Sequence, residues 1–143
     1  MKERGGNLVA SIRQRLINLS QERGEDPNLV FIRYAMERFL YRLSRSKQSG
    51  KFILKGAMLW AIWTGRPHRP TKDLDLLGFG EASGDVLQAI FREICTVGVE
   101  PDGMIFDPDS IQITEIREDV DYPGQRVKLA SRLGNVRISI QID

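Results

Sequence analysis

The chain has 143 residues, of which 41% are hydrophobic and 28% charged, so it can bury one core and has the composition of a soluble globular domain. Its single cysteine, Cys95, excludes an internal disulfide and fits a reducing compartment. No apolar stretch has membrane-spanning length, and no secretory signal is visible. We therefore expect a cytoplasmic protein that does not contact a membrane.

Charge is distributed unevenly along the sequence, although the net charge is only +2. Residues 1–72 contain 15 Lys/Arg and 5 Asp/Glu, whereas residues 73–143 contain 6 Lys/Arg and 14 Asp/Glu. This asymmetry indicates either a polyanionic partner near the first half and a cation near the second, or attraction between the two halves.

Two amphipathic helices are predicted for the first fifty residues. The first should be capped by Asn7 and end near Gly24. Asp26 and Pro27 form a typical cap and first helical position for the second. The apolar face of the second helix comprises Ile32, Met36, Phe39 and Leu43.

The second helix also carries a stripe of basic residues, Arg38, Arg42 and Arg45, at helical spacing. Such a stripe can bind nucleic acid or simply form a solvated helix face, and the sequence leaves both interpretations open.

Strands and helices alternate after Gly50. The pattern predicts a strand at 51–55, a helix at 57–64, a strand at 72–77 and a helix at 85–97. Alternating residues then predict a strand at 111–116. A hairpin should follow, with strands at 126–132 and 136–143 and its turn at Gly134-Asn135. This order favours one α+β (α/β layered) domain over 1–143, helical in 1–50 and sheet-based in 51–143.

Two acidic residues share one face of the second strand. Asp73 and Asp75 alternate with Leu74 and Leu76, so the leucines should enter the core while both carboxylates lie on the other face. Two such charges about 5 Å apart repel by roughly 3 kcal/mol at an effective dielectric near 20. A cation or basic neighbours must offset this, and hard oxygen ligands suit Mg²⁺ or Mn²⁺.

The final strand follows the same alternation. Its apolar positions are Ile138, Ile140 and Ile142, and its polar positions are Ser139, Gln141 and Asp143. If this strand pairs with the one holding Asp73 and Asp75, three carboxylates meet on one face. Such a set can hold two metal ions that position a triphosphate and activate a hydroxyl nucleophile.

A candidate phosphate-binding turn precedes the acids. Lys55, Gly56 and Ala57 end a strand and open a predicted helix, whose free N–H groups can bind an anion. Lys55 can contact phosphate or lie along the strand surface as a snorkelling residue. Taken alone, the lysine-glycine turn and the Asp-Leu-Asp pattern are weak signals; their order along the chain strengthens both.

Two segments together resemble a known family. Phe52-Ile-Leu-Lys-Gly-Ala-Met-Leu-Trp60 and Arg69-Pro-Thr-Lys-Asp-Leu-Asp-Leu-Leu77 resemble the signature of AbiEii/AbiGii toxin nucleotidyltransferases, within the polymerase-β-like superfamily. The resemblance covers roughly residues 50–143. It implies a mixed nucleotidyltransferase-like sheet with the N-terminal helices packed on it.

The resemblance also assigns residues. The catalytic and metal-binding acids are Asp73, Asp75 and Asp143, and the nucleotide- or phosphate-binding residues are Lys55, Gly56, Ala57, Arg69 and Thr71. Arg69 can equally neutralise the acids. Ala57 departs from the family's usual glycine or serine; its backbone N–H remains, but the hydroxyl that a serine could offer to phosphate or metal is absent.

By this resemblance the chain is a Mg²⁺- or Mn²⁺-dependent enzyme that transfers NMP from an NTP to an acceptor, RNA or tRNA, as a toxin with a cognate antitoxin. One alternative is a small antitoxin that modifies a partner protein. Another is a non-catalytic remnant that binds nucleotide or a partner. Because family members continue beyond the third acid, we also expect a truncated form with low turnover and self-association through its exposed sheet side.

The remaining chemically distinctive residues have ordinary interpretations. His68 is the only histidine, which leaves no histidine-based triad or zinc site. Trp60 and Trp63 are expected to pack in the core or against a helix, and Cys95 to be a small buried residue rather than a nucleophile.

Overall fold

The computed structural model of the chain describes residues 2–55, 73–78, 83–116 and 124–143. Its helices are α1 (Lys2–Arg23), α2 (Pro27–Arg45) and α4 (Gly84–Cys95), with short 3-10 turns η1 (Ser49–Lys51) and η2 (Pro108–Ser110). Its strands are β1 (Phe52–Lys55), β2 (Asp73–Gly78), β3 (Met104–Phe106), β4 (Gln112–Ile116), β5 (Gly124–Leu133) and β6 (Val136–Ile142).

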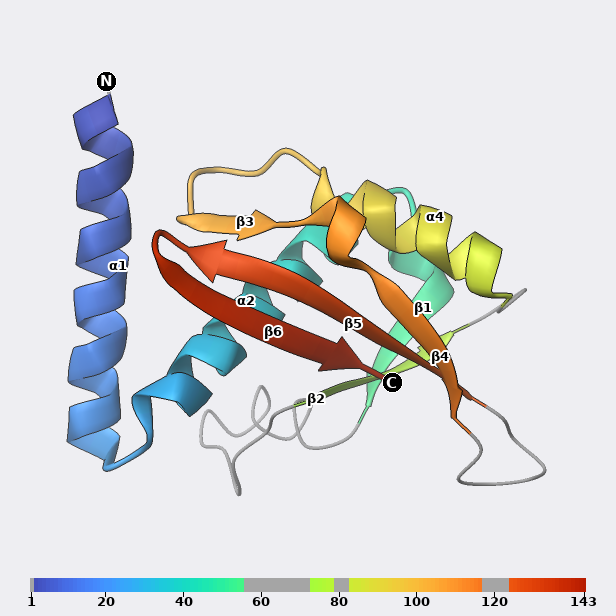
Figure 1. Ribbon diagram of the computed structural model, residues 1–143, viewed down its shortest axis with the longest axis horizontal. Coiled ribbons are helices and arrows are strands. Elements are labelled where there is room, and N and C mark those ends of the chain that lie inside the picture. Colours follow the sequence, from blue (N-terminus) through green and yellow to red (C-terminus); the bar gives the residue numbers. More distant parts are fainter. Residues whose placement is uncertain (1, 56–72, 79–82, 117–123) are drawn as a thin grey trace.

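The strands form one six-stranded mixed sheet (Figure 1). The order is β1-β2-β6-β5-β3, and β4 pairs with β5 beside β3. Strands β2 and β6 are parallel, whereas the other pairs are antiparallel. The predicted α+β class and mixed sheet are therefore confirmed.

The predicted hairpin forms between β5 and β6, in register from Val127 with Ile142 to Leu133 with Val136. Gly134 opens the turn with a φ of 59°, a left-handed conformation that favours glycine. Alternate residues of β6 enter the core, since Ile138, Ile140 and Ile142 are each no more than 4% exposed. The alternation predicted for this strand is confirmed.

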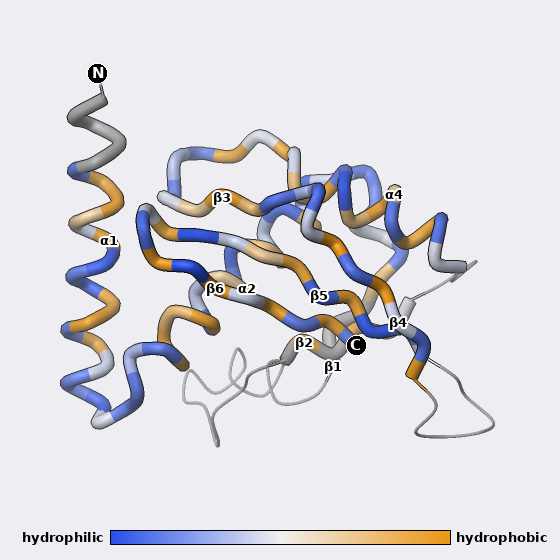
Figure 2. Tube along the Cα trace, viewed as in Figure 1, coloured by the Kyte–Doolittle hydropathy of each residue, from blue (hydrophilic) through white to orange (hydrophobic). Residues whose placement is uncertain are grey.

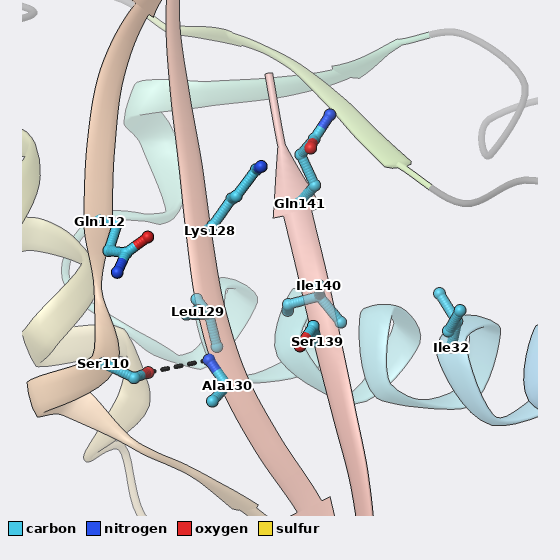
Figure 3. Close-up of a pocket in the computed structure, with 9 residues that line it drawn as sticks. All are labelled: Ile32, Ser110, Gln112, Lys128, Leu129, Ala130, Ser139, Ile140 and Gln141. Atoms are coloured by element: carbon cyan, nitrogen blue, oxygen red, sulfur yellow. Dashed lines mark hydrogen bonds between the residues drawn. The ribbon is translucent and has the colours of Figure 1, made fainter.

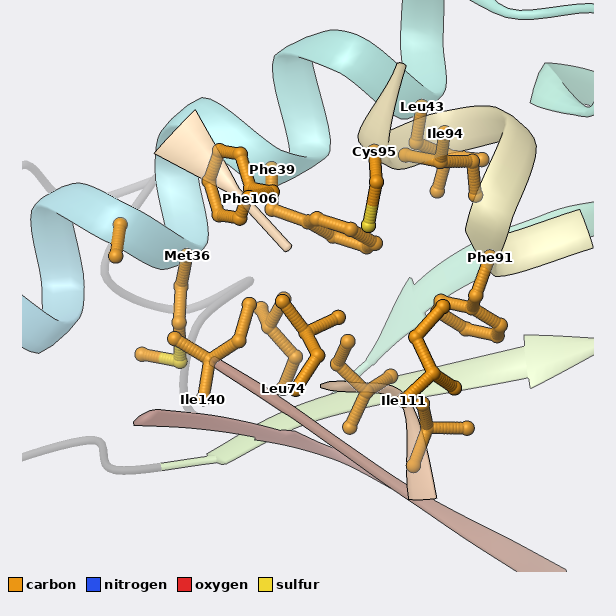
Figure 4. Packing of buried hydrophobic residues seen from close by; sticks show 14 of the residues in the cluster. Met36, Phe39, Leu43, Leu74, Phe91, Ile94, Cys95, Phe106, Ile111 and Ile140 are labelled. Carbon is orange, nitrogen blue, oxygen red and sulfur yellow. The ribbon is translucent and has the colours of Figure 1, made fainter. Parts of the chain in front are cut away.

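Helices α2 and α4 cover one face of the sheet, and the hydrophobic core lies between these helices and the sheet (Figures 1 and 2). Figure 4 shows Met36 and Phe39 of α2 meeting Leu74 of β2 and Ile140 of β6. The Phe39 ring stacks on Phe91 of α4 at a centroid distance of 5.7 Å. Because Leu74 is fully buried, packing fixes the position of β2 against the helices.

The start of α1 differs from the prediction. Asn7 lies inside a helix that begins at Lys2, so its assignment as a cap is wrong, while the end near Gly24 is confirmed. A capping preference is worth only about 1 kcal/mol, and residues 2–4 are good helix formers. None of the described helices is both long and apolar enough to cross a membrane.

Local signals located the other helices well. The Asp26 side chain caps α2 by accepting a hydrogen bond from the Asn28 N–H at 2.9 Å, as predicted. Helix α4 begins one residue before its predicted start, with Ser83 as its cap, and ends two residues early. Strand β3 was not predicted, because three residues are too few to show a periodicity.

Candidate active site

The parallel pairing of β2 with β6 determines where the predicted acids lie. Asp73 is registered with Gln141, and Leu74 with Ile142. One step further, the Asp143 N–H donates to the Leu74 carbonyl at 2.8 Å, and the Leu76 N–H donates to the Asp143 carbonyl at 2.9 Å. Residue 75 is therefore the direct neighbour of Asp143, so the strand pairing on which the three-acid hypothesis depends is present.

The same row of the sheet continues across two further strands. On one side, β1 pairs with β2 and registers Lys55 with Asp75. On the other side, the Asp143 side chain reaches Arg126 of β5. Adjacent strands are about 4.8 Å apart, and registered positions share a face. The row thus orders lysine, aspartate, aspartate and arginine positions on four strands.

Arg126 and Asp143 form a two-bonded ion pair. The Arg126 Nε donates to Asp143 Oδ1 at 2.9 Å, and an Arg126 terminal nitrogen donates to Oδ2 at 3.1 Å. The two side chains are 30% and 24% exposed, respectively. A planar guanidinium holding both carboxylate oxygens fixes the orientation of the carboxyl group as well as balancing its charge.

The carboxylate oxygens at these positions are suitable ligands for a hard divalent cation. A carboxylate has about four lone-pair sites on its two oxygens, so the two bonds from Arg126 leave Asp143 able to accept a further ligand. Mg²⁺ prefers such oxygen ligands. Among the side chains that the structure describes, no three His, Cys, Asp or Glu residues group together, and those of Asp73 and Asp75 lie outside that set.

Several predicted site residues lie outside the described residues. These are Gly56, Ala57, Arg69 and Thr71 of the expected phosphate site, together with His68, Trp60 and Trp63. The predicted helix at 57–64 and the loop after it lie there too, and Lys55 is placed through its backbone at the end of β1. The phosphate-binding assignments therefore remain predictions.

Two of the three arginines in the basic stripe on α2 form ion pairs within the fold. Arg42 is only 5% exposed and donates to both carboxylate oxygens of Asp102, at 2.7 and 3.0 Å. Arg38 donates to the same carboxylate at 2.7 Å. For Arg42 both interpretations, nucleic-acid contact and a solvated face, are therefore wrong, because an acid distant in sequence buries its guanidinium in an ion pair. Arg38 shares that carboxylate with its side chain 27% exposed, and for the exposed Arg45 both interpretations stay predictions.

The charge on Asp102 is stabilised by its surroundings. Burial alone would raise the pKa of this carboxyl, but hydrogen bonds from Arg42, Arg38 and the Met104 N–H outweigh burial and lower it. The group therefore stays ionised and ties α2 to the segment before β3. This contact supports attraction between the basic and acidic halves of the chain.

A shallow hollow of about 620 Å³ lies on the sheet beside the acidic row (Figure 3). Lys128 of β5 lies between Gln112 of β4 and Gln141 of β6, and Ser139 lies further along β6. These four side chains supply hydrogen-bond donors and acceptors, while Ile32, Leu129, Ala130 and Ile140 add apolar surface. The hollow can therefore receive a polar or anionic group near the acids.

The basic residues of β5 were not predicted as site residues. Arg126, Lys128 and Arg132 occupy alternate positions, and the residues between them, such as Val127 and Leu129, are buried. This period of two is visible in the sequence and would have located the three side chains on the face opposite the core.

Cys95 has no role in the site. It is buried in α4, and burial raises the pKa of its thiol to about 11. A thiol with so high a pKa is a poor nucleophile at neutral pH, which confirms the prediction that Cys95 is a small buried side chain.

Comparison with known proteins agrees with this arrangement. Residues 38–143, about three quarters of the chain, match the family model described as "Nucleotidyl transferase AbiEii toxin, Type IV TA system". No individual curated protein matches the sequence. The matched range includes β2, β5 and β6, the strands that carry the acidic row. The chain therefore belongs to the AbiEii nucleotidyl transferase toxin family of type IV toxin–antitoxin systems.

Proposed function

We propose that this protein transfers a nucleoside monophosphate from an NTP to an RNA acceptor, with Asp73, Asp75 and Asp143 as its catalytic, metal-binding acids. The observation that carries the proposal is the pairing of β2 with β6, which makes residue 75 and Asp143 direct neighbours. Family membership supports nucleotidyl transfer as the reaction class and a cognate antitoxin as a partner.

The three acids would hold Mg²⁺ or Mn²⁺, which neutralises the triphosphate and activates the acceptor hydroxyl when bound. The chain's own contribution is to position these ligands. Leu74, fully buried between the two aspartates, anchors β2 in the core. Arg126 holds the Asp143 carboxylate in one orientation through two hydrogen bonds. Ligands held by packing and by supporting hydrogen bonds are what catalysis requires.

The phosphate side of the site would come from Lys55, Gly56 and Ala57, followed by Arg69 and Thr71. Lys55 is registered with Asp75, which puts a cationic residue next to the acids at the end of β1. A lysine at that position can neutralise a triphosphate held by the metal ions, as lysine does in other phosphate sites. Its positive charge also reduces repulsion between the acids before substrate binds.

A labelling experiment tests the reaction. Purified protein is incubated with each of four α-labelled NTPs, total tRNA and a mixture of candidate proteins, in the presence of Mg²⁺ or Mn²⁺. We expect label on RNA from wild type and a loss of at least a hundredfold for Asp75→Asn. Label on protein alone would overturn the RNA acceptor, and unchanged transfer by Asp75→Asn would overturn the acidic site.

The matched control is Asp109→Asn. Asp109 is an exposed aspartate of η2 whose side chain forms an ion pair with Arg92 at the surface. The substitution removes the same charge from a place that the proposal does not involve. Transfer by this variant should equal that of wild type.

A further inference from the structure

We propose that the acceptor RNA crosses the open face of the sheet, with its phosphates held by Arg132, Arg137 and Lys128 and its reactive end at the acidic row. This inference rests on the proposed function, because it assigns a surface to the acceptor of that reaction. The surface comprises the outward positions of β5 and β6, on the face opposite α2 and α4 (Figure 1).

The clearest sign is a like-charge pair. Arg132 and Arg137 are registered directly opposite each other next to the hairpin turn, and both are exposed. Residues in such cross-strand positions have Cβ atoms about 5 Å apart, and like charges there are destabilising. Neither arginine forms an ion pair with any acidic side chain that the structure describes. The sheet thus carries a repulsive pair that an anionic ligand would neutralise.

The surface between this pair and the acids has the character of a polar track. From the arginine pair toward the acids, the next pair of outward-facing residues is Ala130 and Ser139, and the pair after that is Lys128 and Gln141. The hollow of Figure 3 lies over these two rows, with Gln112 on its far side. Small and hydrogen-bonding side chains let a nucleic-acid backbone approach the sheet, while Lys128 supplies a third cation.

The length of the track favours a polynucleotide over a single nucleotide. Arg137 and Asp143 lie at opposite ends of the outward row of β6, six residues apart, which corresponds to about 20 Å along a strand. One NTP at the acids would not reach the arginine pair, whereas an acceptor strand of several nucleotides would. An acidic segment of a partner protein is the competing occupant, and the experiment separates the two.

The test compares two doubly substituted proteins. Arg132→Gln/Arg137→Gln removes the like-charge pair, and Arg13→Gln/Arg15→Gln removes two exposed arginines of α1 as the matched control. Binding of a fluorescein-labelled single-stranded RNA oligonucleotide is measured by anisotropy at several salt concentrations, without NTP or divalent metal. If two phosphate contacts are lost, the slope of log affinity against log salt should become shallower by about 1.4.

The difference in slope corresponds to a measurable difference in affinity over a range of salt. Between 50 and 200 mM salt, wild type should lose about sevenfold more affinity than the Arg132/Arg137 variant, whereas the α1 control should follow wild type. Thermal melting supplies a second measurement: the sheet variant should melt at the same temperature as wild type or higher, since repulsion is removed. Reduced RNA binding together with a lower melting temperature would indicate damage to the fold and overturn the assignment.

Further outcomes of these experiments would overturn the proposal or favour an acidic protein over RNA as the ligand of this surface. A wild-type salt slope in the sheet variant, or an equal change in the α1 control, would overturn the proposal. Displacement of the RNA by poly-glutamate at equal charge concentration would assign the surface to an acidic protein instead. The labelling experiment is independent of these results. If label reaches RNA with an unchanged KM for RNA in the sheet variant, only this inference fails; if no label is transferred but RNA binding depends on the arginine pair, only the proposed reaction fails.

Discussion

Replacing Asp102 with alanine should destabilise the fold more than any change at the surface. The Asp102 side chain is 7% exposed and accepts hydrogen bonds from Arg38, from both terminal nitrogens of Arg42 and from the Met104 N–H. Its removal leaves the Arg42 guanidinium, also 7% exposed, without its counter-charge. Removing one partner of a buried ion pair costs about 3–5 kcal/mol of folding free energy.

That loss is a large part of the total, since domains of this size are stable by about 5–15 kcal/mol. It should appear as a fall in the melting temperature of about 10 °C or more. Asp109→Ala is the control, because it breaks an ion pair whose side chains are 51% and 79% exposed. Exposed pairs contribute about 0–1 kcal/mol. A loss below 1 kcal/mol in urea denaturation of Asp102→Ala would refute the reasoning.

The same contact predicts a pH dependence. Burial opposes the charge on Asp102, but its hydrogen-bond donors lower the pKa below the ordinary 3.8, so the stabilisation is present above that value. It is lost as the pH falls through the lowered folded-state pKa. Melting from pH 6 down to pH 3 should therefore show a steeper loss for wild type than for Asp102→Asn, which has no carboxyl to protonate. Parallel curves would contradict this assignment.

Three further predictions concern other parts of the molecule. Arg126→Gln removes the two hydrogen bonds that orient the Asp143 carboxylate, so Mn²⁺ titration by calorimetry should show binding about tenfold weaker. Tighter binding would show that Arg126 competes with the metal ion for that carboxylate instead of positioning it. Gly134→Ala should cost roughly 1–3 kcal/mol in urea denaturation, because φ is 59° and a Cβ would lie 2.7 Å from the Val9 side chain; Gly98→Ala, in open space, should be neutral. Cys95 should react with Ellman's reagent slowly in the native protein and rapidly in urea, because its thiol is buried and its pKa is raised to about 11. Fast labelling of the native protein would show that the thiol is accessible and readily ionised.

The fold was predictable from sequence where one periodicity dominated. The hairpin of β5 and β6 combines strict alternation with a glycine turn, and both signals agree with the sheet that forms. The second helix was also predictable, because its Asp26 cap and the spacing of its apolar residues both indicate the same helix. The start of α1 was not predictable, because a short-range capping preference of about 1 kcal/mol competes with the helix propensity of the residues before it.

The candidate site was predictable only in part, because alternation fixes the face of a residue but not its neighbour. Asp73, Asp75 and Asp143 were assigned to sheet faces from their own strands. Their proximity depends on β2 pairing with β6, a long-range contact that no local pattern specifies. The Arg126 contact with Asp143 depends in the same way on the hairpin register. The glycine turn and Arg69 lie outside the described residues, so their assignment to phosphate binding remains a prediction.

The ion pairs of the arginines on α2 show why the distribution of charge along a sequence is a poor guide to a binding surface. The basic half of the chain suggested a polyanion site on α2, yet Arg38 and Arg42 both pair with Asp102 of the acidic half, which offsets one of their two charges. In the acidic half, by contrast, Arg132 and Arg137 are exposed and face each other on the sheet. A cation attracts a ligand only to the extent that the fold leaves its charge unbalanced. The proposed polyanion surface therefore lies in the half of the chain with net negative charge, next to the acids that would perform the reaction.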